Sequence, residues 1–174
     1  MKYILITISF FCLQPGLNAQ VADSLFINAH LTKLTNAKTY TLQVASLMPE
    51  EKYTFKPVDD EMNFGKQLLH ISENLCWLSS SYLSGIKNPI TDKDKKSTSK
   101  EAIMQVVTKA YDFAISTLQK FDTKMLPDTV EFFAGPKNKL QIINLLEDHQ
   151  THHRGQLLVY LRFNNIKPPT YVGW

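Results

Sequence analysis

Apolar residues recur at alternating steps of four and three along residues 60–83, and this spacing limits the fold more than any other feature of the chain. The apolar positions are Phe64, Leu68, Ile71, Leu75, Leu78 and Tyr82. Because an α-helix turns once in about 3.6 residues, they form one continuous stripe on one helical face. Such a face has to be buried against other elements. The segment therefore predicts a packed helix, capped by Asp59 or Asp60 and ended by Gly85.

Three further segments have the length and apolar content of helices, and they cover residues 21–47, 98–121 and 138–165. The second begins with Thr98 and Glu101, which form a capping-box pair. The last is stopped by Pro168 and Pro169, because proline cannot continue a helix. No strand-like alternation, internal repeat or low-complexity tract stands out. Four such helices predict an all-α fold, a four-helix bundle, whose long second and third connections leave the topology open.

The first 19 residues differ from the rest and have the features of a signal peptide. Lys2 supplies a positive charge, residues 3–13 form an apolar run, and Ala19 is a small residue suited to cleavage. The run is shorter than the roughly 20 apolar residues that a membrane span needs. A buried N-terminal strand or helix is the alternative. We expect residues 1–19 to direct export, and residues 20–174 to form one periplasmic domain with no stable membrane span.

Composition argues against several classes of function. The formal net charge is +3 and the acidic and basic residues are interspersed, so no nucleic-acid partner is expected. Removal of the leader would leave Cys76 as the one cysteine, which excludes an intramolecular disulfide. The chain has no glycine-rich phosphate loop, no dinucleotide-binding fingerprint and no arrangement typical of a serine or cysteine nucleophile. The expected ligand is a small molecule of unspecified class.

Two histidines occupy stripe positions in the last predicted helix. The stripe consists of Ile142, Leu146, His149, His153, Gln156, Tyr160 and Phe163. His149 and His153 lie one turn apart on one face, so both imidazoles can converge on one metal ion. Core histidines satisfied by hydrogen bonds are the alternative, although each would need a buried partner. Gln150 stands where a zincin peptidase needs a glutamate base, so peptide hydrolysis by that route is not expected.

A third ligand is needed, because a catalytic metal site usually has three protein ligands. The candidates are His30 and His70, and periodicity does not choose between them. His70 lies about 120 degrees from the centre of its helix's stripe, on the flank that also holds Trp77. A metal bound there would lie in a groove between helices. His152, about 100 degrees around the helix from His153, is expected at the surface or behind the ligands.

Two stretches of the chain resemble the DinB-like family, which includes the YfiT-type metal-dependent hydrolases. They are "YTFKPVDDEMNFGKQLLHISENLCWL" (residues 53–78) and "DHQTHHRGQLLVYLRFNNIKPPTY" (residues 148–171). The resemblance implies an up-down-down-up four-helix bundle in which His70, His149 and His153 bind a divalent metal, most often zinc or nickel. It also implies a solvent-reachable cleft and a homodimer. Characterised relatives include thiol-dependent transferases and isomerases that use a low-molecular-weight thiol.

Residues around these histidines have expected supporting roles. Three carboxylates are candidates to orient a ligand imidazole, namely Glu73, Glu147 and Asp148. Arg154 is expected either to pair with a carboxylate of a neighbouring helix or to be an ordinary surface arginine. Trp77 and Tyr160 each lie seven residues from a candidate ligand, which predicts that both line the cleft.

Three functions are compatible with these patterns. The first is a metal-dependent enzyme, of the hydrolase or thiol-dependent S-transferase type, with an open coordination position. The second is an exported metal-binding protein without catalysis, in which a fourth protein ligand closes the site. The third is a metal-free helical bundle that binds a partner. The histidine pattern favours the first two over the third and does not separate them.

Overall fold

The computed structural model describes residues 15–174, and the side chains from Val21 onward. Its long helices are α1 (Pro15–Leu47), α2 (Phe64–Leu78), α4 (Lys100–Gln119) and α5 (Lys139–Phe163). The shorter elements are η1 (Glu50–Lys52), the π-helical η2 (Ser79–Ser84), α3 (Asp92–Lys95), η3 (Thr123–Met125), β1 (Thr129–Val130) and β2 (Lys137–Asn138). The predicted all-α class and the four long helices are confirmed. The short antiparallel pair of β1 and β2 and the single-turn α3 were not predicted.

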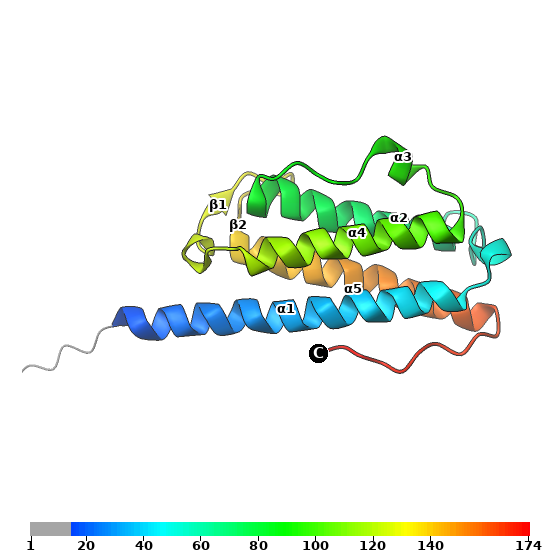
Figure 1. The fold of residues 1–174 in the computed structure, drawn as a ribbon, viewed down its shortest axis with the longest axis horizontal. Coiled ribbons are helices and arrows are strands. Elements are labelled where there is room, and N and C mark those ends of the chain that lie inside the picture. Colours follow the sequence, from blue (N-terminus) through cyan, green and yellow to red (C-terminus); the bar gives the residue numbers. More distant parts are fainter. Residues whose placement is uncertain (1–14) are drawn as a thin grey trace, which may run out of the picture.

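The long helices form a bundle with up-down-down-up topology (Figure 1). Helices α1 and α5 run in one direction, and α2 and α4 run in the other. Helix α1 packs against α4 and α5, and α2 packs against the same two helices. This order settles the topology that helix spacing alone left open. It also makes α2 and α5, which carry the histidines of interest, direct neighbours.

The predicted stripe of α2 lies in the core of the bundle. Phe64, Leu68, Ile71, Leu75 and Leu78 are all buried, and Tyr82 beyond them is half-buried. Full burial of each such side chain contributes roughly 1.5–3 kcal/mol to folding. Opposite them lie buried apolar residues of α4 and α5, among them Ile103, Val107, Ile142, Ile143 and Leu146. The apolar period of the sequence therefore predicts the buried face correctly.

The helix ends differ from the expected caps at two places. Asn63 caps α2, where its side chain accepts a hydrogen bond from the Lys66 backbone N–H at 2.9 Å. Asp59 and Asp60 lie upstream in the connection, so the prediction that one of them is the cap is wrong. Asn63 is the cap because it directly precedes Phe64, the first buried residue of the stripe. At the other end Gly85 has φ of +67°, which ends the helical run as predicted.

The start of α4 is also shifted. Ser99 is its cap and accepts from the Ala102 backbone N–H at 3.3 Å, so the expected Thr98–Glu101 capping box is off by one residue. Helix α5 begins as predicted, with Asn138 and Gln141 forming a reciprocal capping box.

The predicted leader is not tested by this structure. Residues 1–14 lie outside the described part of the chain, and so do the side chains of residues 15–20. Helix α1 begins at Pro15, earlier than the expected start at Val21, and runs through the predicted cleavage position after Ala19. Among residues 15–174, no helix combines the length and the apolar character that crossing a bilayer requires. Export therefore stays a prediction.

We expect the Asn63→Ala variant to lose about 1 kcal/mol of unfolding free energy, because the Lys66 N–H would lose its capping acceptor. The matched Asp60→Ala variant removes an exposed carboxylate that does not cap α2. It should change stability by less than about 0.5 kcal/mol. Urea unfolding of both variants at one pH measures the difference. Equal losses in the two variants would contradict the assigned cap.

Candidate metal centre

Three histidines meet where α2 packs against α5. His70 projects from α2, and His149 and His153 project from successive turns of α5. One ligand nitrogen from each lies within 4.8 Å of the others. The ring centroid of His70 is 4.9 Å from that of His149 and 4.5 Å from that of His153. The structure thus brings the three predicted ligands together at the contact between two helices.

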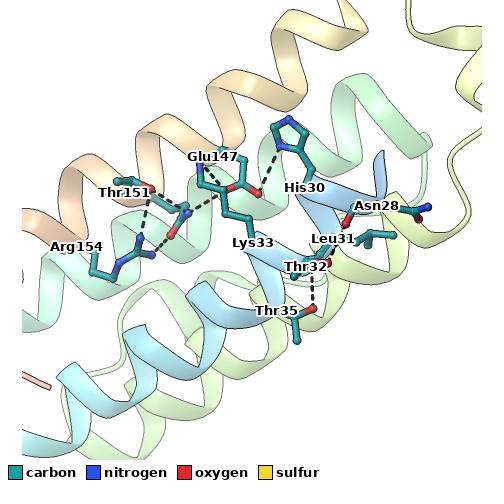
Figure 2. Close-up of polar contacts among 10 residues, drawn as sticks. Asn28, His30, Leu31, Thr32, Lys33, Thr35, Glu147, Thr151 and Arg154 are labelled. Carbon is teal, nitrogen blue, oxygen red and sulfur yellow. Dashed lines mark hydrogen bonds and ion pairs between the residues drawn. The ribbon is translucent and has the colours of Figure 1, made fainter. Parts of the chain in front are cut away.

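The other two histidines stand outside this cluster, as expected. His152 is exposed, and its Nε2 lies 3.0 Å from Nε2 of Gln156. His30 belongs to α1, where its Nδ1 is 3.8 Å from the Glu147 carboxylate. Figure 2 shows His30 and Lys33 approaching Glu147 from α1. Helix packing, rather than the spacing within one helix, chooses His70 over His30.

A buried glutamine fixes the orientation of His153. Nδ1 of His153 lies 2.6 Å from Oε1 of Gln67, which is fully buried. Since an amide oxygen only accepts, Nδ1 carries the hydrogen and Nε2 keeps its lone pair. The partner of a metal-binding imidazole usually acts in this way. The Gln67 amide nitrogen in turn donates to Oε1 of Gln156, so the glutamine is held from both ends.

Sequence reasoning missed Gln67, although a signal was present. The residue lies three positions after Phe64 and four before Ile71, on the apolar face of α2. A polar residue at a buried stripe position needs a specific partner. That requirement marks it as a residue with a structural role, but the partner becomes visible only when α5 is in place.

One polar atom of the cluster has no partner among the described residues. Nδ1 of His149 is buried and makes no hydrogen bond in the structure. An unsatisfied buried polar group costs roughly 1–3 kcal/mol. A coordinated ion or a water molecule would offset that cost. The donor set therefore fits a metal ion with an affinity for imidazole nitrogen, as zinc and nickel have.

Burial also keeps the ligands in the form that binds metal. Burial, with smaller contributions from His70 and His152, lowers the pKa of His149 to about 4. The pKa of His153 falls to about 4 for the same reason, with smaller contributions from His149, His70 and His152. Both imidazoles are therefore neutral at pH 7. Only the neutral ring offers a lone pair to an ion.

The three candidate carboxylates do not orient these rings. Glu147 is buried but faces α1, where Lys33 Nζ lies 3.8 Å from its carboxylate (Figure 2). Asp148 is exposed, and Glu73 makes no hydrogen bond to a histidine. In residues 21–174 the amide of Gln67 takes the orienting role that was expected of a carboxylate.

Arg154 also differs from both expectations. It is buried, and it donates hydrogen bonds to Oε1 of Gln150 and, at 3.3 Å, to Oγ1 of Thr151 (Figure 2). Its guanidinium lies 5.4 Å from the centre of the Tyr40 ring. No carboxylate in the described part of the chain pairs with it. The hydrogen bonds of Arg154 therefore stay within α5, and its contact with α1 is made through the Tyr40 ring.

A pocket of about 370 Å³ opens beside the histidine cluster. Its wall on α2 consists of His70, Glu73, Asn74 and Trp77. The segment that connects α2 to α4 adds Asn88, Ile90 and Lys95. Trp77 therefore shares a cleft with His70, as predicted. Tyr160 does not line it, because its side chain is 2 % exposed and its hydroxyl donates to the Met62 carbonyl at 2.8 Å.

Comparison with known proteins gives a family match along most of the chain. The description of the matching family is "DinB family", and the match covers residues 25–171. Among curated proteins, the uncharacterized protein YjoA of Bacillus subtilis is 20 % identical over 139 residues, which is 78 % of this chain and 88 % of YjoA.

Two solved structures have the same fold. A DinB-like protein from Bacillus cereus superposes with a TM-score of 0.71 at 23 % identity, covering 83 % of this chain and 97 % of that one. The DinB-like protein YjoA from Bacillus subtilis gives a TM-score of 0.67 at 16 % identity, covering 82 % of this chain and 96 % of that one.

The lowered histidine pKa values predict how the metal-free protein responds to acid. Between about pH 6.5 and 4 the unfolded chain binds protons at His149 and His153 that the folded chain does not. Stability should therefore be full above about pH 6.5 and should fall as the pH drops toward 4. Urea midpoints of chelator-treated protein across this range measure the slope. A His149→Gln variant should give a shallower slope, and an identical slope would contradict the assignment.

Gln67 gives a second prediction. The Gln67→Ala variant should bind zinc about 10–100-fold more weakly, because His153 would lose the partner that fixes its tautomer. Gln67→Glu keeps an acceptor for the Nδ1 hydrogen and should retain more of the affinity. Competition with a chromophoric chelator measures both values. Gln105→Ala, which alters an exposed glutamine on α4, is the control and should leave zinc affinity unchanged.

Proposed function

The chain belongs to the DinB family, and on that premise we propose that it is a metal-dependent enzyme whose ion, zinc or nickel, is held by His70, His149 and His153. The observation that carries the proposal is the convergence of these imidazoles beside a pocket. Neutral imidazole nitrogen is a preferred ligand of both metals.

The number of ligands supports an enzyme over a storage or carrier protein. Structural zinc sites usually have four protein ligands, whereas catalytic sites have three and keep one position open. No cysteine or carboxylate of residues 21–174 joins the three histidines. Cys76 is buried, and burial raises the pKa of its thiol to about 12, so it stays protonated. An ion held by these three side chains would keep one position open, and the pocket that His70 lines lies beside it.

The bound ion would act as a Lewis acid. It would lower the pKa of a coordinated water toward neutrality, or it would bind the thiolate form of a thiol substrate. The residues of the chain would perform the remaining tasks. Gln67 holds His153 in the tautomer that presents Nε2. The pocket wall from Glu73 to Trp77 would position the substrate. Hydrolysis and thiol-dependent S-transfer both fit these parts. We favour hydrolysis, because the predicted export would remove the protein from cytoplasmic thiols.

Metal analysis tests the first half of the proposal. Protein purified without a histidine tag should contain close to one divalent ion per chain, or should take up one zinc or nickel ion after chelation. His70→Ala, His149→Ala and His153→Ala should each abolish that binding, because two imidazoles rarely hold an ion. His152→Ala should retain it. Folded wild-type protein that takes up neither metal would refute the site.

Activity tests the second half. Ester, amide and thiol substrates are screened with the metal-loaded protein, and any turnover should disappear with a chelator and return with the ion. X-ray absorption of the zinc form should show three imidazoles and one water-derived ligand. A spectrum with a fourth protein ligand and no exchangeable position would favour the non-catalytic metal-binding protein.

A further inference from the structure

The pocket beside the histidines follows one face of α2. Residues His70, Glu73, Asn74 and Trp77 lie at relative positions 0, 3, 4 and 7, so their side chains share that face. At about 1.5 Å per residue, His70 and Trp77 are about 10 Å apart along the helix. Glu73 and Asn74 lie midway, one turn from each. The pocket thus has a histidine end, a polar middle and an aromatic end.

The polar middle offers hydrogen-bond acceptors that nothing in the structure uses. The Oδ1 atom of Asn74 is buried and has no donor. The Glu73 carboxylate forms no ion pair and no hydrogen bond with any residue of the described chain. The buried Oδ1 of Asn74 costs free energy unless a ligand or a water molecule supplies an N–H or O–H group, and the half-buried Glu73 carboxylate is free to accept from the same ligand.

The lysine that lines the pocket already has a carboxylate partner outside the pocket wall. Lys95 at the rim lies 3.8 Å from the Asp92 carboxylate, so its ammonium has a local anion. Asn88 uses its Oδ1 to accept from the Ile90 backbone N–H at 2.8 Å. Glu73 is therefore the wall charge that lacks a partner. A ligand that complements this wall carries a positive, donor-bearing group.

Trp77 forms the aromatic end of the pocket, and aromatic side chains from two other parts of the chain pack against it. The Trp77 ring stacks on Phe132 with centroids 5.7 Å apart and on Phe133 with centroids 6.3 Å apart. Tyr82 meets Trp77 edge-on at 5.4 Å. Phe133, in the turn between β1 and β2, is 84 % exposed. Trp77 in the pocket wall therefore offers a surface for a flat apolar group, with the exposed Phe133 beside it, and aromatic π faces also attract a cation.

From these three observations we propose that the pocket binds a small molecule that joins a protonated amine to an apolar, preferably aromatic, group. The ammonium donates to the Glu73 carboxylate and to Oδ1 of Asn74, about one helical turn from His70. The apolar group lies against Trp77, one turn farther on. This inference rests on the proposed function, because it names the substrate class that the metal centre would act on.

A matched pair of probes tests the proposal by NMR titration of the zinc-loaded full-length protein. Phenethylamine carries the ring and the ammonium, and 3-phenylpropionate carries the same ring and chain length with a carboxylate. The amine should bind at least tenfold more tightly. Glu73→Gln should weaken amine binding about tenfold, the loss expected for one charge-assisted hydrogen bond, without weakening the carboxylate probe. Trp77→Ala should weaken both probes.

Controls separate this proposal from the metal centre. Glu101→Gln, on the exposed face of α4, should leave both affinities unchanged. Zinc content is measured for every variant, and the titration is repeated without zinc. Amine selectivity in a protein that never binds zinc would support the pocket and refute the proposed function. Zinc binding with equal affinities for the probes, with tighter binding of the carboxylate, or with no binding of either probe would overturn the amine pocket and leave the metal centre standing.

Discussion

The antiparallel contact between α2 and α5 is the interaction on which the rest of the site depends. It places His70 against His149 and His153, and it brings the fully buried Gln67 within hydrogen-bond distance of His153. The apolar residues around these groups provide the energy of the contact, since Leu68, Ile71 and Leu146 are fully buried. The polar residues fix its register, because a shift of one turn would leave Gln67 without a partner.

A second buried polar network fixes how the helices are placed relative to one another and adds little to the net stability of the bundle. Tyr111 is buried between Oγ1 of Thr41 and Oε1 of Gln150, each 2.9 Å from its hydroxyl. Arg154 donates to the same glutamine oxygen. Buried polar groups of this kind stabilise little in net terms, but they are costly to leave unpaired. Helix α5 is therefore held by specific partners on two sides, toward α2 by His153 and toward α1 by Glu147 and Arg154.

The sequence predicted those parts of the structure that follow from periodicity. The stripe from Phe64 to Leu78 specified which face of α2 is buried, and the four-residue spacing of His149 and His153 placed both on one side of α5. Features that depend on contacts between helices were out of reach. His70 could be chosen over His30 only through the family resemblance, and the partner of Gln67 lies 86 positions away in the chain. Tyr160 shows where periodicity misleads. Its position seven residues after His153 predicted that it lines the cleft, but its hydroxyl donates a hydrogen bond to the Met62 carbonyl instead.

Because α2 and α4 run in parallel, the segment that connects them is long, and its sequence can vary more freely than that of the helices. A chain that leaves one end of α2 must travel the length of the bundle before α4 begins, and Figure 1 shows this crossover passing α3 on its way. The crossover supplies one wall of the pocket but none of the histidines. Insertions or exchanges in that segment would reshape the cavity while leaving the buried helix contacts intact. The fold thus separates a wall segment that can vary in sequence from the helix contact that holds the three histidines together.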